Sequence, residues 1–413
     1  MSVSWSKIFA DRTSRMKASD IRELLKLTAR PEIISLAGGL PAPELFPLDE
    51  YRRAFEWVLE TNGSAALQYG PSEGFRPLRE FLAERMTRLG VPAAADEVLI
   101  TNGSQQGLDL VGKIFLNPGD AVCMENPSYM GAIQAFDSYQ AEYVIVPMDD
   151  DGMRSEELDA ILRRRPVKFI YALPNFQNPS GRTMSTARRE ILVETAKKHG
   201  VPIVEDDPYG ELRFEGEQLP SLRSMWPEGV VYLGTFSKIL APGFRLGWLV
   251  APPELYDEIV FGKQPTDLHT STGTQMATYE VCRSHDGAFL EEHIEKIRAV
   301  YRERRDVMVQ AMEEHFPEGC TWTRAQGGLF VWAELPPSVD TRELLAEALE
   351  ENVAFVPGQS FHPDRGGHNT MRLNFSNVTP DRIEEGIARL GRAIKRRLAR
   401  AGQEAGEGVA VSP

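Results

Sequence analysis

The chain has 413 residues, of which 42% are hydrophobic and 26% are charged, so it has the composition of a soluble globular protein and the length for two domains. Its formal net charge of -14 argues against a nucleic-acid or anionic-membrane partner, and any bound anion must meet a local basic pocket. No stretch approaches the roughly 20 apolar residues of a membrane span, and no apolar signal-peptide core follows Met1, so the sequence predicts a cytoplasmic protein without a membrane partner.

The N-terminal region combines one expected helix with two loops that are rich in turn residues. Ser19 to Leu27 is expected to be helical, because a capping residue precedes an apolar stripe. Arg22 lies off that stripe and, taken alone, is more typical of a solvated helix residue than of a ligand. The loop from Ser35 to Pro41 contains Gly39, where backbone can approach a ligand closely. Tyr69 lies in a second such loop, where a tyrosine usually anchors the loop itself.

From residue 97 onwards, short apolar runs alternate with helical patterns. Helices are expected at Gly107 to Phe115 and at Thr186 to His199, each between two strand candidates. Strands that alternate with helices pair in parallel, so we expect an α/β fold whose large domain has a mainly parallel seven-stranded sheet between helices. The seven strand candidates are Val98–Ile100, Ala121–Met124, Tyr143–Val146, Phe169–Leu173, Val201–Val204, Val230–Leu233 and Leu246–Val250.

Polar clusters follow five of these strands. Lys238 comes after Val230–Leu233 together with two hydroxyls, and Arg245 follows a Pro-Gly turn. A lone lysine is more often a solvated surface residue, but ligands of open α/β sheets bind at the carboxyl ends of strands. Hydroxyls and a guanidinium suit a phosphate, and an amine can form an imine. Together the clusters indicate a site for an anionic carbonyl compound; they are residues 101–107, 125–129, 174–181, 205–209 and 235–245.

The rest of the pattern predicts a smaller α+β domain. A long amphipathic helix from Leu290 to Phe316 should join the domains, and a final helix should end near Leu398. In the strand Thr370 to Ser376, alternation places Arg372 on the polar face, where the alternative is an edge-strand cation. The three cysteines lack metal-ligand spacing, so no metal site is predicted. The expected divisions are 1–48 (an N-terminal segment and helix that belong with the small domain), 49–290 (the large domain), 291–400 (the linking helix and the C-terminal small domain) and 401–413 (a disordered tail).

Taken in order, these motifs resemble the fold-type I pyridoxal phosphate aminotransferases, and the likeness covers the chain from about Trp5 to Leu398. Residues 21–27 and 36–47 resemble in particular the bacterial 2-aminoadipate aminotransferases of lysine biosynthesis and the mammalian kynurenine/aminoadipate aminotransferases. Each motif is weak alone, and their number and order carry the likeness. The motifs are Gly103-Ser104-Gln105-Gln106, Asn178-Pro179-x-Gly181, Asp206-x-x-Tyr209, and Ser237-Lys238 with Arg245. The one lesser departure is Thr235, where serine is common.

The resemblance implies that pyridoxal 5'-phosphate (PLP) is the cofactor. Lys238 would carry it as a Schiff base and move the proton at the substrate Cα, with Asp206 on the pyridinium nitrogen. The other residues implied at the cofactor ring are Tyr129, Asn178 and Tyr209. Those implied at its phosphate are Ser104, Gln105, Thr235, Ser237, Arg245 and, from a second subunit, Tyr69. Those implied at the substrate are Arg22, on the N-terminal helix that covers the active site, and Gly39, Asn178 and Arg372.

The same resemblance implies an aminotransferase (EC 2.6.1) that works by a ping-pong mechanism as a homodimer with composite active sites. It would move an amino group from an L-amino acid to 2-oxoglutarate, with 2-aminoadipate and glutamate as donors and leucine or aromatic donors used more weakly. Racemases and decarboxylases use the same scaffold, and it also forms the sensor half of some transcription regulators. Those regulators carry an N-terminal DNA-binding domain, which few residues here could form, and the carboxylate-binding arginines favour transamination.

Overall fold

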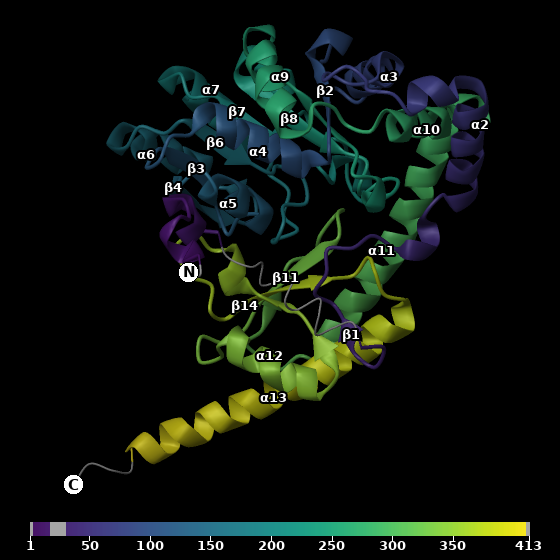
Figure 1. Ribbon diagram of the computed structural model, residues 1–413. Helices are drawn as coiled ribbons and strands as arrows, with labels where there is room; N and C mark the ends of the chain where they lie inside the picture. Colours follow the sequence, from purple (N-terminus) through teal and green to yellow (C-terminus); the bar gives the residue numbers. More distant parts are fainter. Residues whose placement is uncertain (1–2, 17–29, 410–413) are drawn as a thin grey trace.

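The computed structural model describes residues 3–16 and 30–409, with side chains as far as Arg400. Its largest sheet has the strand order β2-β9-β8-β7-β6-β3-β4-β5 (Figure 1). Neighbouring pairs among β3, β4, β6, β7 and β8 are parallel, whereas β9 runs antiparallel to both β8 and β2. The predicted α/β fold with a mainly parallel sheet is thereby confirmed. The strands are β2 (Val98–Thr101), β3 (Ala121–Asn126), β4 (Glu142–Asp149), β5 (Gly152–Met153), β6 (Phe169–Ala172), β7 (Ile203–Asp206), β8 (Val230–Thr235) and β9 (Gly247–Val250).

All seven predicted strands are present, but the sheet has an eighth strand that the sequence analysis missed. This strand, β5, is only two residues long and pairs antiparallel with the end of β4 after a turn through 150–151. A two-residue strand has no apolar run to mark it, so the count of seven was wrong by this one edge strand.

Helices cover both faces of the large sheet because successive residues of its buried strands point to opposite faces. In β6, Phe169 and Tyr171 pack with residues of α4, α5 and α9, whereas Ile170 and Ala172 pack with residues of α6 and α7. The helices are α2 (Leu48–Ala66), α3 (Arg76–Arg88), α4 (Ser104–Phe115), α5 (Met130–Asp137), α6 (Leu158–Arg164), α7 (Thr186–His199), α8 (Leu222–Met225), α9 (Pro253–Asp267), α10 (Thr272–Arg283), α11 (Phe289–His315), α12 (Thr341–Glu350) and α13 (Pro380–Val409).

Two small sheets lie beneath the large one in Figure 1. One pairs β1 with β12 in parallel, and the other has the antiparallel order β10-β11-β14-β13. The sequence predicted the strand that contains Arg372, but it did not predict β1, because it placed Ser35 at the start of a loop. Their bounds are β1 (Ile34–Ser35), β10 (Thr321–Trp322), β11 (Phe330–Glu334), β12 (Val353–Ala354), β13 (Val356–Pro357) and β14 (Thr370–Asn374).

The long helix α11 connects the two groups of sheets and packs along α13. Near its start, Arg85 of α3 forms ion pairs with Glu291 and with Glu211, which lies in the segment after β7. Further along, the buried Arg305 forms an ion pair with Glu215. The segment after β7 therefore holds this helix at two points, while α13 packs along it.

Helix α13 was expected to end near Leu398, with disorder from residue 401. The structure instead continues the helix to Val409, because Ala, Gln and Glu have high helix propensity and the glycines there do not end the helix. The expected disorder of 401–413 stays a prediction, and 410–413 lie outside the described residues. The predicted helix at Ser19 to Leu27, with Arg22, also lies outside them.

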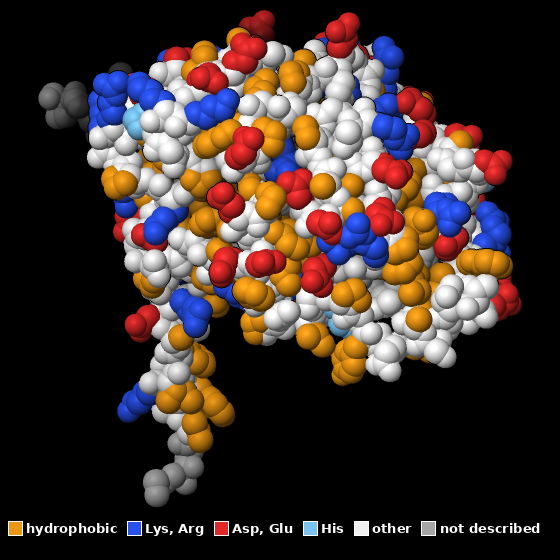
Figure 2. Space-filling model, turned by 90° about the horizontal axis from the view of Figure 1, so that it is seen from above, with side chains coloured by type: hydrophobic (Ala, Val, Ile, Leu, Met, Phe, Trp, Pro, Cys, Tyr) orange, Lys and Arg blue, Asp and Glu red, His pale blue; other side chains and the backbone are white. Residues whose placement is uncertain are grey.

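The described surface mixes charge and apolar groups. Figure 2 shows acidic and basic side chains interspersed on the face seen from above. The N-terminal residues 3–16 form two short 3-10 turns that project from the body at the lower left of that view, with Trp5, Ile8 and Phe9 more than 60% exposed. Across residues 3–16 and 30–409, no helix has both the length and the apolar character needed to cross a membrane.

Candidate active site

Lys238 stands in the turn that follows β8, where its Nζ donates a hydrogen bond to the Gly39 carbonyl, 2.9 Å away. Gly39 comes from the loop after β1, so this contact joins the large sheet to the small ones. Burial, together with the positive charges of Arg372 and Arg245, lowers the pKa of Lys238 to about 8. Near neutral pH the side chain is therefore far more often a neutral amine than an ordinary lysine is.

Asp206 ends strand β7 and is buried. The Tyr171 hydroxyl donates a hydrogen bond of 2.8 Å to its Oδ2. The other oxygen, Oδ1, is also buried and has no hydrogen-bond partner among the described residues. Burial raises the pKa of Asp206 to about 7, and the bond from Tyr171 opposes that rise. The carboxylate therefore has one fixed oxygen and one that can accept a further donor.

Asn178 connects two other predicted residues. Its Nδ2 donates to the Tyr209 hydroxyl at 3.3 Å, and its Oδ1 accepts from Arg372 at 2.8 Å. All three side chains are buried. Tyr209 and Asn178 follow large-sheet strands, whereas Arg372 belongs to β14. The predicted cofactor and substrate groups thus meet in one hydrogen-bonded chain that spans both parts of the fold.

Arg372 is in the site, but not as alternation along its strand described it. The sequence analysis placed it on the polar face, or on an edge strand; β14 lies between β11 and β13, and Arg372 is only 2% exposed. Its guanidinium carbon lies 4.2 Å from the ring centre of Phe330 and 4.9 Å from that of Phe361. Both faces of β14 are buried, so the polar face of the pattern is an internal site rather than solvent.

The turn after β2 and the turn after β8 face each other. Gly103 has a φ of 73°, and a Cβ added there would lie 2.5 Å from a terminal nitrogen of Arg245. Only glycine allows this approach. Thr235 Oγ1 accepts a hydrogen bond from the Ser237 backbone N–H at 3.1 Å. Hydroxyls, the exposed Arg245 guanidinium and the start of α4 at Ser104 therefore collect at one corner, which suits an anion.

Tyr129 immediately precedes α5 and is coupled to the same charges. Burial and the charge of Asp206 raise its pKa to about 12, while Arg372 and Arg245 act in the opposite direction. Gln105 Nε2 donates to the Gly131 carbonyl at 2.8 Å, which ties the start of α4 to that of α5. Tyr129 and Gln105 thus lie at the starts of α5 and α4, and their roles at the cofactor stay predictions.

Two predicted residues are not brought to this site within the described chain. Tyr69 is 78% exposed, and its ring meets His269 edge-on with centroids 5.9 Å apart. Arg22 lies outside the described residues.

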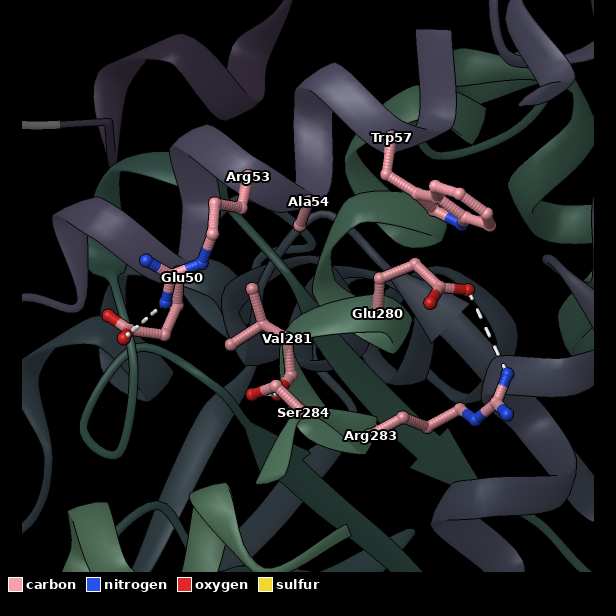
Figure 3. A pocket seen from close by; sticks show the side chains of 8 residues that line it. All are labelled: Glu50, Arg53, Ala54, Trp57, Glu280, Val281, Arg283 and Ser284. Atoms are coloured by element: carbon pink, nitrogen blue, oxygen red, sulfur yellow. Dashed lines mark hydrogen bonds and ion pairs between the residues drawn. The ribbon is translucent and has the colours of Figure 1, made fainter. Parts of the chain in front are cut away.

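A separate hollow of about 330 Å³ lies between α2 and α10 and contains no predicted residue (Figure 3). Its charged side chains form the pairs Arg53–Glu50 and Arg283–Glu280.

Sequence reasoning missed several groups that hold the site. Tyr171 was recognised only as part of a strand, although it fixes Asp206. The Ala37 carbonyl accepts a 2.7 Å bond from Arg372, and no sequence pattern marks a backbone acceptor of this kind. Phe330 lay in a stretch where a strand was expected, whereas Phe361 lay in no predicted segment. Only the position of Tyr171, a hydroxyl within an apolar run, was a usable signal.

These groups fit PLP. The site offers an amine of lowered pKa for an aldehyde, a buried carboxylate oxygen with no other donor for a pyridinium nitrogen, and an anion-binding corner for a phosphate. An aromatic side chain and a phenol–amide pair lie among them. The fold and this set of groups define a PLP-dependent enzyme of fold type I.

Comparison with known proteins gives the family. The model of the aminotransferase class I and II family matches residues 32–390, and the chain belongs to that family. It is 46% identical to the aromatic-amino-acid aminotransferase 1 of Thermococcus litoralis, over 96% of each chain. It is also 46% identical to the 2-aminoadipate transaminase of Thermus thermophilus, over 96% of this chain and 99% of the relative.

Among solved structures, the fold matches the alpha-aminoadipate aminotransferase LysN of Thermus thermophilus, in complex with N-(5'-phosphopyridoxyl)-L-leucine. The TM-score is 0.90 and the identity 45%, covering 96% of this chain and all of that one. The predicted fold, family and cofactor are confirmed. The protein is a PLP-dependent aminotransferase, and its substrates are amino acids and 2-oxo acids.

Proposed function

We propose that this enzyme transfers the amino group of 2-aminoadipate or glutamate to 2-oxoglutarate, and accepts leucine and aromatic donors more weakly. The names of its relatives support this range, since one is a 2-aminoadipate transaminase and another an aromatic-amino-acid aminotransferase. The solved structure of the Thermus thermophilus alpha-aminoadipate aminotransferase also contains a phosphopyridoxyl adduct of leucine. The observation that carries the proposal is Arg372, a buried cation between two phenyl rings, whose Nε has no hydrogen-bond partner among residues 3–16 and 30–400. It offers charge for a carboxylate and apolar surface for the rest of a substrate.

Lys238 is proposed as the residue that carries the cofactor and moves the proton. When bound, PLP supplies an electron-withdrawing ring that stabilises negative charge at the substrate Cα. A base near that carbon must be neutral, and the pKa of about 8 keeps a substantial fraction of Lys238 in that form. Its bond to Gly39 holds the amine at the boundary between the two parts of the fold, so Gly39 is proposed to line the substrate side.

Asp206 is proposed to hold the pyridinium nitrogen through Oδ1, while Tyr171 keeps Oδ2 occupied. A positive nitrogen close to this carboxylate would favour its ionised form and oppose the effect of burial on its pKa. Tyr129 is proposed to stack on the ring. Asn178 and Tyr209, which already bond each other, are proposed to donate to the phenolic oxygen.

The anion-binding corner is proposed to hold the phosphate. Its geometry offers the hydroxyls of Thr235 and Ser237, the guanidinium of Arg245 and the first turn of α4. A dianion at a helix start is stabilised by free backbone N–H groups and the helix dipole. The proposed phosphate residues are Ser104, Gln105, Thr235, Ser237 and Arg245.

A coupled assay of amino donors against 2-oxoglutarate tests the substrate range. We expect kcat/KM to be highest for 2-aminoadipate and glutamate and lower for leucine and phenylalanine. Arg22→Ala should lower kcat/KM for 2-aminoadipate by about ten- to a hundredfold, the cost of a lost charge-assisted bond, and leave leucine nearly unchanged. Equal losses for both donors would refute a role for Arg22 at the distal carboxylate.

We also propose that the enzyme is a homodimer in which Tyr69 reaches the cofactor phosphate of the partner. The exposure of Tyr69 supports this arrangement, as do the exposed Trp5, Ile8 and Phe9 of the projecting N-terminal turns. Sedimentation should give a dimer, and Tyr69→Phe should weaken PLP binding by about tenfold. An active monomer would contradict the proposal.

The remaining expectations are proposals of the same kind. We propose that 49–290 form the large domain and that 1–48 and 291–400 form the small one, a division supported by the separate sheets. A cytoplasmic location and a place in lysine biosynthesis stay predictions.

A further inference from the structure

The polar turn after β2 has two sides, and the proposed phosphate site uses only one of them. Ser104 begins α4 beside Arg245 and the β8 turn. The side chains of Asn102 and Gln106 instead extend to the last turn of α9, where they meet Lys263 and Asp267. None of these four residues belongs to the set that the sequence predicted for the cofactor.

The contacts on this second side form a closed network. Asp267 Oδ2 accepts hydrogen bonds from Asn102 Nδ2 at 2.5 Å and from Gln106 Nε2 at 2.7 Å. Gln106 Oε1 in turn accepts from the Asn102 backbone N–H at 2.8 Å and from Lys263 Nζ at 2.9 Å. The side chains of Asn102 and Gln106, and the backbone N–H of Asn102, are thus held in one network with this ion pair.

The Lys263–Asp267 ion pair is buried rather than exposed at the surface. Lys263 has 0% side-chain exposure and Asp267 has 20%, and they approach to 2.8 Å. The remaining bond of Lys263 goes to Thr270 Oγ1 at 3.2 Å. A buried pair seldom adds much stability over apolar residues of similar size, but removing one partner leaves the other uncompensated. Stabilisation of the fold alone therefore does not account for a charged pair at this place, because two apolar residues would serve it as well.

We propose that Lys263 and Asp267 are positioning residues that fix the phosphate-binding turn 102–106 from behind. The pair acts through Asn102 and Gln106 and touches neither the phosphate nor the substrate. It orients the first turn of α4, so that the backbone N–H groups and the Ser104 hydroxyl are preorganised for an anion. Binding then requires little ordering of the turn, which is the usual benefit of preorganisation.

The inference rests on the proposed phosphate site, and the test separates the two. The ligands are PLP and pyridoxal, which lacks the phosphate, and the readout is the dissociation constant of each from the apoenzyme by absorbance titration. Lys263→Met and Asp267→Asn should each weaken PLP by roughly tenfold, the effect of losing a charge-assisted bond, and change pyridoxal by less than about twofold. The 31P resonance of bound PLP should also shift.

Two further variants keep the test decisive. The double variant Lys263→Met with Asp267→Leu replaces the pair by apolar groups, which should preserve the thermal stability of the apoenzyme while PLP binding still weakens. Tyr171→Phe, at the opposite end of the cofactor, should weaken PLP and pyridoxal equally because both contain the pyridine nitrogen.

Equal losses of PLP and pyridoxal in the Lys263 or Asp267 variants, or no loss of either, would overturn the proposal. The variant Ser104→Ala then decides whether the positioning role or the phosphate assignment is wrong. If Ser104→Ala narrows the preference for PLP over pyridoxal and the Lys263 and Asp267 variants do not, then the positioning role is wrong. If Ser104→Ala also leaves that preference unchanged, then the phosphate assignment is wrong.

Discussion

The two arginines of the site have opposite surroundings. Arg245 is exposed and stands at a positive φ of 55°, and within the described part of the chain its guanidinium donates to the carbonyls of Pro242 at 3.3 Å and Asn102 at 3.5 Å. Arg372 is buried, lies in the middle of a strand, and is held by Asn178 and Ala37 at 2.8 and 2.7 Å. Burial lowers the pKa of Arg372 to about 10.

The difference matches what each arginine is proposed to bind. A permanently bound phosphate brings two negative charges of its own, so an exposed and loosely held cation is sufficient beside fixed hydroxyls and helix N–H groups. A substrate carboxylate comes and goes in every half-reaction, and both donor and acceptor must find the same geometry. A cation whose desolvation is already complete, and whose position two rings fix, meets that need.

The largest effect is expected at Lys238, which lies between the two arginines. Lys238→Ala should abolish transamination with every donor, because the residue that moves the proton is gone. In the wild type, borohydride should attach the cofactor irreversibly to the peptide that contains Lys238, as read by mass spectrometry. Attachment to Lys263 or to another lysine would show that the site is wrongly assigned.

A smaller but general effect is expected at Arg372. Arg372→Leu should lower kcat/KM for all amino donors on the order of a hundredfold, about 3 kcal/mol, while the PLP dissociation constant changes little. Arg372→Lys keeps the charge but lacks the planar fork, and should recover only part of the loss. If PLP binding falls instead of kcat/KM, then the assignments of the two arginines are interchanged.

Replacing Arg245 should weaken PLP binding rather than lower kcat/KM, and the loss should be smaller than at Arg372. Arg245→Leu should weaken PLP binding by about tenfold and leave the relative kcat/KM values of the donors unchanged once the cofactor is saturating. Because Arg245 is exposed, raising the salt concentration should weaken PLP binding in the wild type more than in the variant. Equal salt dependence of the two proteins would contradict an electrostatic role for this side chain.

The smallest effect concerns the pKa of Lys238, which both arginines lower from its ordinary value. Removing a positive neighbour makes the protonated form less costly, so the pKa should rise toward its ordinary value, more in Arg372→Leu than in Arg245→Leu. The measurement is the pH dependence of Lys238 carbamylation by cyanate in the apoenzyme, since only the neutral amine reacts. A wild-type midpoint near pH 10 would disprove the perturbation.

Much of this site could be predicted because it follows a rule of sheet geometry. Asp206, Asn178 and Lys238 come directly after apolar runs, and the carboxyl ends of parallel strands meet at one edge. The phosphate corner was marked by glycine and hydroxyl residues in turns, where residue type reports local backbone conformation. Arg372 was recognised through the resemblance, and its alternation pattern was right about the strand, whereas the alternative of an edge-strand cation was wrong.

The missed groups share a different property. Tyr171, Lys263 and Asp267 act through partners that are remote in sequence, and a tyrosine in a strand or an i,i+4 ion pair on a helix is usually unremarkable. Their meaning depends on burial and on the side chain opposite, which no local pattern reports. For the same reason no sequence pattern marked Phe330 and Phe361 as the two rings that enclose Arg372.

The length of helix α11 makes the position of its far end sensitive to small changes in its tilt. Its 27 residues make a rod of about 40 Å, so a tilt of about 5° at its first turn would move its far end by roughly 3.5 Å. That displacement exceeds the length of the bond between Arg372 and Asn178. The ion pairs of Arg85 with Glu211 and Glu291 tie the first turn of the helix to α3 and to the segment after β7, so a charge change in this cluster is expected to alter the tilt of the helix and, through it, the substrate side.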